Sequence, residues 1–242
     1  MKETSGVCRP GEMNITVRAV QLCGWKKEDR IADLGCGNGA SLEYLEKMYG
    51  IRGTGLEADP SFCDGKRILH GDASKLPYKD HAMDGVLMEC SLSRMDEPEK
   101  VLAECFRVLK PGAFLAVSDM MAEGDEVTET VLKEPESPTS MDGEHAADIR
   151  RTGTETDKER RAGRPAETLG RLEAEQRIED RFRQAGFQIC QVENHNEALK
   201  QWFGQLLFSY GKSGLGEVLG LPWDRVKKAK CGYRLWILRK NG

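Results

Sequence analysis

Three glycines within five positions follow an acidic residue in the segment Asp33-Leu34-Gly35-Cys36-Gly37-Asn38-Gly39-Ala40. Glycine tolerates positive φ and lets a ligand approach the backbone closely. The amides at the start of a helix that opens at Ala40 would face such a ligand. The spacing therefore predicts a strand, a tight turn and a helix that together bind a nucleotide. We expect the cofactor contacts of this turn to come from Gly35, Cys36, Gly37 and Gly39.

Asp33 indicates which nucleotide the turn binds. The pattern G-x-G-x-x-A at 35–40 is also typical of dinucleotide-binding folds. A carboxylate two positions before the first glycine would repel a pyrophosphate, whereas S-adenosylmethionine (SAM) has no phosphate and carries an ammonium and a sulfonium. Asp33 therefore favours SAM over NAD as the cofactor. Its alternative role is to cap the turn through its own backbone.

A second acidic residue, Glu57, ends the next strand-like run, 51–57. A carboxylate at the carboxyl end of the second strand can accept hydrogen bonds from both ribose hydroxyls, so we expect Glu57 to bind the ribose. Asp59 is the competing candidate, and its alternative role is to cap the segment that follows. Residues 59–67 leave room for only one or two helical turns before the next strand.

The third acidic residue is Asp72 in Gly71-Asp72-Ala73, after the short apolar run at 68–69. The Asp72 carboxylate can accept a hydrogen bond from the adenine amino group while the amide of Ala73 donates to a ring nitrogen. The acidic residues Asp33, Glu57 and Asp72, in this order along the chain, indicate an adenosine-containing cofactor more strongly than any one of them alone.

The ordered motifs at 33–39, 55–57, 71–73 and 107–112 resemble those of class I SAM-dependent methyltransferases. Within that superfamily the chain is most similar to the small-molecule branch of ubiquinone/menaquinone C-methyltransferases and arsenite methyltransferases. The resemblance implies an α/β fold: a Rossmann-like doubly wound sheet of about seven strands, mostly parallel, with an antiparallel last strand between the fifth and sixth. It also implies an N-terminal segment that folds over the pocket, where Thr16 and Arg18 would reach the ligands.

The strand predicted at 84–89 brings further polar residues to the ligand-binding edge, because ligands of open α/β sheets bind beyond the carboxyl ends of the strands. We expect Glu89 to bind the amino end of the cofactor, and Cys90 and Ser91 to line the substrate pocket. The alternatives are that Cys90 only packs in the core and that Ser91 caps the following helix. Asp119 is expected to end the buried strand 113–118 at this edge and to line the same pocket.

Periodic patterns predict the remaining elements. Asn14 is expected to cap a helix over 15–22, and Pro98 to open a helix that stops at 110–112. The later elements are a helix near 178–185, a strand over 187–192, a helix over 199–210 and a final strand over 233–238. Residues 133–168 contain few large apolar side chains, which predicts either a mobile insertion or a lid.

Composition narrows the class of partner. The chain has 242 residues and a formal net charge of -4, with 36 basic and 40 acidic side chains, so no electrostatic footprint for nucleic acid or an anionic membrane is present. It has no apolar run of signal-peptide or membrane-spanning length, so we expect a cytoplasmic protein with a small-molecule substrate. We expect one domain over 1–242 with a polar insertion at about 123–176; the oligomeric state is not indicated.

The eight cysteines show no C-x-x-C spacing, which argues against a metal site. A trio of thiolates that the fold assembles for arsenite is the open alternative.

Methyl transfer from SAM would proceed by in-line SN2 displacement, in which the cofactor supplies the activation and the protein aligns the reactants. His195 is the candidate general base, because histidine has an ordinary pKa of about 6.5; its alternative is a solvated loop position. The function classes are a SAM-dependent methyltransferase that acts on a small molecule, an NAD-dependent oxidoreductase and a non-catalytic SAM-binding module.

Overall fold

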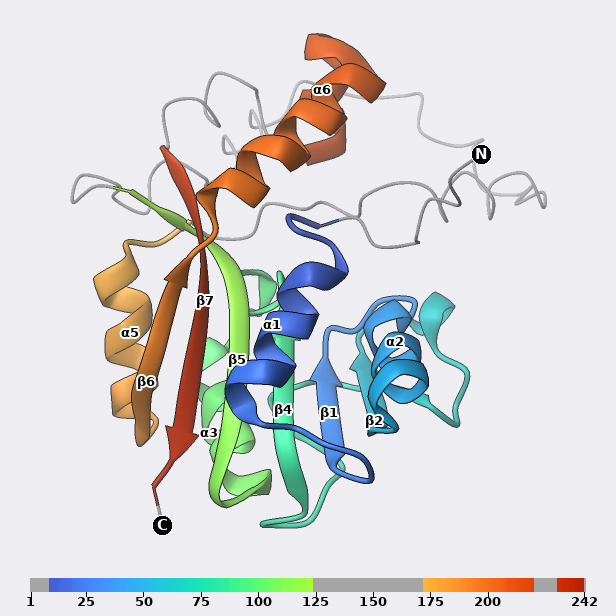
Figure 1. Ribbon diagram of the computed structural model, residues 1–242, viewed down its shortest axis with the longest axis vertical. Helices are drawn as coiled ribbons and strands as arrows, with labels where there is room; N and C mark the ends of the chain where they lie inside the picture. Colours follow the sequence, from blue (N-terminus) through green and yellow to red (C-terminus); the bar gives the residue numbers. More distant parts are fainter. Residues whose placement is uncertain (1–8, 124–171, 220–229, 242) are drawn as a thin grey trace, which may run out of the picture.

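The computed structural model of the protein describes residues 9–123, 172–219 and 230–241, and the side chains of residues 212–219 are outside that description. Its centre is a seven-stranded sheet with the strand order β3-β2-β1-β4-β5-β7-β6 (Figure 1). The strands are β1 (Arg30–Leu34), β2 (Arg52–Glu57), β3 (Ile68–His70), β4 (Met83–Glu89), β5 (Leu109–Ala122), β6 (Phe187–Asn194) and β7 (Cys231–Lys240). β7 is antiparallel to both of its neighbours and the other pairs are parallel, which confirms the predicted fold.

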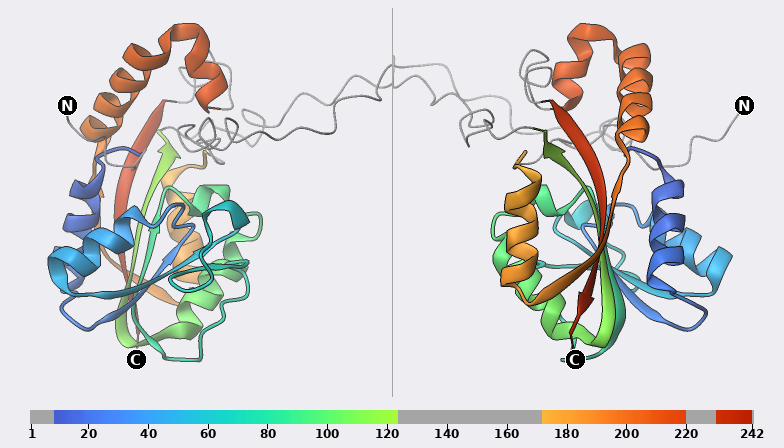
Figure 2. Two further views of the ribbon diagram at one scale, coloured as in Figure 1. Left: turned by 90° about the vertical axis from the view of Figure 1, so that its right-hand side faces the viewer. Right: turned by 60° about the vertical axis from the view of Figure 1, so that its left-hand side comes forward.

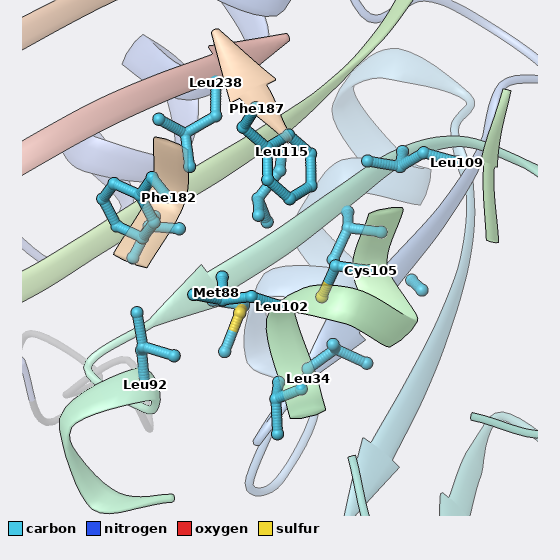
Figure 3. Packing of buried hydrophobic residues seen from close by; sticks show 14 of the residues in the cluster. Leu34, Met88, Leu92, Leu102, Cys105, Leu109, Leu115, Phe182, Phe187 and Leu238 are labelled. Atoms are coloured by element: carbon cyan, nitrogen blue, oxygen red, sulfur yellow. The ribbon is translucent and has the colours of Figure 1, made fainter. Parts of the chain in front are cut away.

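Helices cover both faces of the sheet (Figures 1 and 2). α1 (Met13–Cys23), α2 (Ala40–Tyr49) and α6 (Asn196–Leu219) contribute to one apolar core, and α3 (Pro98–Val108) and α5 (Glu175–Gln184) to the other. Figure 3 shows the second core, in which Leu102 of α3 and Phe182 of α5 face strand residues such as Leu115. Because both faces are buried, the central strands β1, β4 and β5 are rich in apolar residues.

The order of the strands places a topological switch between β1 and β4. The chain adds β2 and β3 on one side of β1 and then returns to add β4 and β5 on the other side. The crossover helices leave a crevice beyond the carboxyl ends of the strands at such a point, and ligands of open α/β sheets bind there.

Several predicted element boundaries are wrong. α3 ends at Val108, before the predicted stop at 110–112, and β5 already begins at Leu109. α1 begins at Met13 with Glu12 at the N-cap position, so Asn14 lies inside the helix and does not cap it. β5 continues to Ala122, because its pairing with β7 extends to Ala122 and Cys231; Asp119 therefore lies within the strand and not at its end.

Other local predictions are confirmed. α3 begins at Pro98, which fits the first helical turn because proline lacks the amide hydrogen that would remain unpaired there. The segment after β2 holds a single 3-10 turn, η1 (Pro60–Phe62), capped by Asp59 through the amide of Ser61. Most of the predicted insertion at 123–176, including the expected lid at 133–168, lies outside the described residues. Among the helices of the described part, none has the length and apolar character to cross a membrane.

Candidate functional site

Three carboxylates form a row along the carboxyl ends of β2, β1 and β4. Asp33 pairs in register with Gly55 of β2 and Leu87 of β4, and Glu57 and Glu89 each lie two residues beyond those partners. Side chains alternate along a strand, so all three carboxylates point to the face that α1 and α2 cover. We call Asp33, Glu57 and Glu89 the acidic row; it lies at the switch between β1 and β4.

The glycine turn closes over this row. Gly35, Gly37 and Gly39 all have positive φ, at 73°, 54° and 75°. At Gly35 the fit is also steric, because a Cβ atom there would lie 2.6 Å from Cβ of Ser91. The turn thus presents bare backbone toward the edge where the row lies, as the sequence predicted. The Cys36 side chain packs against Gly55, where a Cβ would approach its sulfur to 2.3 Å.

Asp33 is buried, with 2% of its surface exposed, and no group in the described part of the chain donates a hydrogen bond to it. The alternative of a backbone cap is therefore not supported. The pKa of Asp33 is raised to about 8, chiefly by burial and also by the charges of Glu89 and Glu57, and the charge of Arg9 opposes this shift. A cation that binds next to such a carboxylate stabilises its ionised form and lowers its pKa.

Glu57 is held against the glycine turn. Its carboxylate accepts hydrogen bonds from the amides of Gly37 at 2.8 Å, Ala58 at 2.9 Å and Asp59 at 3.1 Å. Because Asp59 caps η1, Glu57 is the acid of this pair that faces the turn.

The predicted adenine contacts lie on the loop after β3. Asp72 is exposed, and its carboxylate accepts a 2.8 Å hydrogen bond from the amide of Ser74, which lowers the pKa of Asp72. Ala73 packs against the core that contains Leu76. Their roles toward adenine stay predictions.

Glu89 is the centre of a buried polar network that includes a residue the sequence analysis missed. Nη2 of Arg9 lies 2.6 Å from Oε2 of Glu89 and donates to Oγ1 of Thr16 at 2.7 Å and Oγ of Ser41 at 3.0 Å. Thr16 and Ser41 each donate to Glu89 at 2.9 Å. Thr16 is fully buried in this network, as part of the expected N-terminal cover. No motif surrounds Arg9, so spacing could not single it out.

A second polar group lies beyond β4. Cys90 has a φ of 54°, and its sulfur is 3.3 Å from the hydroxyl of Tyr233, which donates to Oγ of Ser118 at 3.1 Å. Burial raises the pKa of Cys90 to about 12 and the pKa of Tyr233 well above its ordinary value. Both groups therefore keep their protons at neutral pH, which makes Cys90 a poor nucleophile. Tyr233 and Ser118 were also missed, since they lie on strands with no functional pattern.

Ser91 and Asp119 have structural partners. Oγ of Ser91 donates to the carbonyl of Leu34 at 2.7 Å, which ties the end of β4 to β1. Asp119 accepts three 2.8 Å hydrogen bonds, from the amide and hydroxyl of Ser93 and from the amide of Met120.

Asp119 also lies on the other face of the sheet. It lines a cavity of about 30 Å³ together with Ile178 and Arg181 of α5. The structure therefore separates Asp119 from the acidic row, and its expected place in the substrate pocket is not supported.

His195 follows β6 and lies next to Glu193. Its Nε2 is 3.4 Å from Oε2 of Glu193, and its amide donates to the carbonyl of Tyr233 at 2.9 Å. Arg18 binds Glu193 as well and does not reach the acidic row, so its predicted contact with the pocket is not supported. The role of His195 as a base stays a prediction. Among the described residues, no three His, Cys, Asp or Glu side chains form a group that could hold a metal ion.

The part of the chain that builds this site also matches a known family. Residues 32–117 match the family profile described as a methyltransferase domain. Over this range the chain is similar to that family. The matched range runs from β1 into β5 and contains the glycine turn and the acidic row. The resemblance to SAM-dependent methyltransferases is thereby confirmed.

Curated relatives align with only part of this chain. The demethylmenaquinone methyltransferase of Renibacterium salmoninarum is 32% identical over 110 residues, which are 41% of this chain and 45% of that protein. The O-methyltransferase resE of Aspergillus sclerotiorum is 31% identical over 103 residues, 37% of this chain and 39% of that protein. The chain thus spans less than half the length of these curated relatives.

Solved structures share the whole fold at low sequence identity. The geranyl diphosphate C-methyltransferase of Streptomyces coelicolor, solved with S-adenosylhomocysteine, has a TM-score of 0.65 and 12% identity, over 93% of this chain and 80% of that chain. The [4+2]-cyclase SpnF has a TM-score of 0.60 and 21% identity, over 94% of this chain and 80% of that chain. The family match and the neighbour solved with S-adenosylhomocysteine support SAM as the expected cofactor.

Proposed function

We propose that this protein binds SAM at the acidic row, at the carboxyl ends of β1, β2 and β4, and transfers its methyl group to a small-molecule acceptor. The observation that carries the proposal is Asp33, a buried carboxylate directly under the glycine turn with Glu57 and Glu89 on either side. A cationic ligand gains from this arrangement, whereas the two phosphates of NAD would add negative charge beside three carboxylates. The site therefore favours a sulfonium cofactor.

The reaction is an in-line displacement at the methyl carbon. A lone pair of the acceptor forms a bond to that carbon as the carbon–sulfur bond breaks, and the bonding electrons return to sulfur. The products are the methylated acceptor and neutral S-adenosylhomocysteine (SAH), and the acceptor gives up a proton where it carried one. The protein contributes alignment and exclusion of water, because the cofactor already carries the leaving group.

His195 is the candidate acceptor of that proton. Cys90 and Tyr233 hold their own protons at neutral pH, so they do not serve as bases. His195→Ala is expected to lower turnover with an acidic acceptor and to leave SAM affinity unchanged. Undiminished turnover in that variant would remove His195 from the mechanism.

The relatives support a small-molecule acceptor and leave the accepting atom open. One acts on demethylmenaquinone and another is an O-methyltransferase. The first screen should therefore include quinol-like rings and phenols, with transfer of a labelled methyl group as the readout.

Calorimetric titration with SAM, SAH and NAD tests cofactor choice before any acceptor is known. Binding of SAM and SAH, absence of NAD binding, and loss of SAM binding in Asp33→Ala are the expected results. Asp180→Asn is the matched control, because Asp180 is exposed on α5 at the opposite face of the sheet. Binding of NAD in preference to SAM would overturn the proposal.

A second candidate is a SAM-binding protein without methyl transfer. It is favoured by one observation, that a [4+2]-cyclase shares this fold, since a fold does not determine the reaction. The labelled-methyl screen separates the two, because only a methyltransferase converts SAM to SAH in step with a methylated product.

A further inference from the structure

The connection between β6 and β7 is much longer than the sheet requires. The two strands are antiparallel neighbours, which a turn of two residues can join, yet 36 residues (195–230) lie between them. Most of these residues form α6, which rises beyond the carboxyl ends of the strands (Figures 1 and 2). Long connections in compact domains are often functional, so α6 is a candidate interaction element.

α6 begins next to the candidate site. A Cβ atom on Gly11 would lie 3.4 Å from Cβ of Ala198, so the start of α6 packs against the turn that leads into α1. The buried side chains of α6 belong to the same core as α1; they are Leu199, Trp202 and Leu206. Measured along the helix axis from Ala198, Gly204 lies about 9 Å and Phe208 about 15 Å further on. The helix therefore leads outward from the edge of the site (Figure 1).

The outer side of α6 carries exposed apolar residues around a glycine. Gly204 is exposed, and a Cβ atom added to it would meet nothing within 4 Å. Leu207 and Phe208 lie three and four residues further along, so both are neighbours of Gly204 on the helix surface. They are 36% and 94% exposed. We call Gly204, Leu207 and Phe208 the α6 surface.

The fold itself does not require glycine at position 204. Glycine inside a helix is less stable than alanine, and no neighbouring atom excludes a side chain here. Gly204 is also not among the glycines with positive φ. A ligand that packs on the bare backbone between Leu207 and Phe208 would account for the missing side chain.

The charge and the size of the α6 surface limit what it binds. No charged side chain occurs from Gln201 to Gly211, so a charged partner would gain no ion pair there, whereas an apolar partner would bury Leu207 and Phe208. A stable dimer buries about 800 Å² on each partner, which is more than these few side chains present. The α6 surface therefore fits a small, uncharged apolar group.

We propose that the α6 surface binds an apolar extension of the methyl acceptor, whose reactive end lies at the candidate site. This assignment rests on the proposed function and specifies its substrate class. The class is uncharged acceptors with an apolar chain or ring system that extends on the order of 10 Å beyond the reactive atom. Contacts with a remote part of the substrate supply binding energy that orients the reacting end.

Calorimetry with a series of alkylphenols tests the assignment in the presence of saturating SAH. The probes are 4-ethylphenol, 4-hexylphenol and 4-octylphenol, which share one ring and differ in the length of an uncharged chain. The affinity of the wild-type protein should rise by roughly twofold for each added methylene, which corresponds to burial of about half of its surface.

Three variants make the result specific. Gly204→Leu covers the bare backbone, so it should remove the dependence of affinity on chain length. Phe208→Gln should weaken 4-octylphenol by roughly fivefold or more and change 4-ethylphenol by less than about twofold. Met48→Gln is the matched control, because Met48 is an apolar side chain on α2 that is 58% exposed; it should keep the wild-type dependence. A cooperative thermal transition shows that each variant is folded.

The outcomes separate this proposal from the proposed function. No dependence on chain length in the wild type, or the same dependence in Gly204→Leu and Phe208→Gln, would overturn the α6 assignment while SAH binding keeps the SAM site. If the wild type does not bind SAH, the proposed function fails, and alkylphenol binding that needs Gly204 would then belong to a site unrelated to methyl transfer.

Two other occupants of the α6 surface are tested by sedimentation. A dimer that Phe208→Gln dissociates would assign the surface to a second copy of the chain. Co-sedimentation with phosphatidylcholine vesicles that the same variant abolishes would assign it to lipid. Either result would overturn the proposal, which expects neither.

Discussion

The hydroxyl of Tyr233 lies 3.3 Å from the sulfur of Cys90 and donates to Oγ of Ser118 at 3.1 Å. Three strands thereby meet through side chains, because Ser118 is on β5, Tyr233 on β7 and Cys90 directly after β4. Tyr233 is fully buried, so this link joins the antiparallel end of the sheet to the candidate site.

Removal of this hydroxyl should cost stability and not cofactor affinity. Tyr233→Phe leaves Ser118 and Cys90 without their shared partner, so we expect the free energy of unfolding to fall by about 1–2 kcal/mol. Urea denaturation measures it. SAH titration serves as the control, because the acidic row is intact in the variant. Unchanged stability would show that the hydroxyl contributes little to the packing of β7.

Asp33 should make the stability of the ligand-free protein fall as pH rises. Its pKa is about 8 in the folded state and 3.8 as a free group, so between these values the folded protein keeps a proton that the unfolded chain has lost. The contribution of this proton to the free energy of unfolding is fully present below about pH 4 and is lost as pH rises through about 8. Asp33→Asn should remove this slope and be the more stable protein at pH 8, by on the order of a few kcal/mol.

Unfolding curves at pH 5.5 and pH 8 test this, with Asp180→Asn as the control that keeps the wild-type slope. Equal pH dependence in Asp33→Asn and the wild type would mean that Asp33 is ionised in the folded protein over the whole range.

SAM binding should release a proton near neutral pH. The ligand carries a sulfonium and an ammonium, which favour the ionised form of Asp33 and so lower its pKa when they bind. The apparent affinity for SAM should therefore rise between pH 6 and pH 8. Calorimetry in two buffers of different ionisation enthalpy measures the number of protons released. The same number in Asp33→Asn would assign the proton to another group.

Gly35→Ala should destabilise the protein and abolish SAM binding. The new Cβ would lie 2.6 Å from Cβ of Ser91 at a residue whose φ is 73°. Gly65→Ala is the matched control, because Gly65 has a φ of 69° but no atom within 4 Å of the added Cβ. We expect a loss of about 1 kcal/mol in the control from backbone strain alone, and about 2–4 kcal/mol at Gly35. Thermal unfolding of both variants measures the difference; equal losses would show that Ser91 moves aside.

Local spacing predicted the parts of the site that are contiguous in the chain. The glycine turn requires positive φ within five residues, and Asp33 and Glu57 lie at the ends of strands, so their place at the ligand edge follows from the order of residues alone. The helix at Pro98 and the single turn after β2 followed from local chemistry in the same way.

Only the tertiary structure decided which distant side chains share a pocket. Arg9, Ser41 and Tyr233 carry no local signal, and they join Glu89 and Cys90 only after the chain has crossed the sheet. Side-chain alternation along β5 also turned Asp119 to the face opposite the acidic row. An acidic residue in a sequence shows only that a negative charge is present. The cation or amide that contacts it is determined by the order of the strands and by the face of the sheet to which it points, and neither follows from the neighbouring residues in the chain.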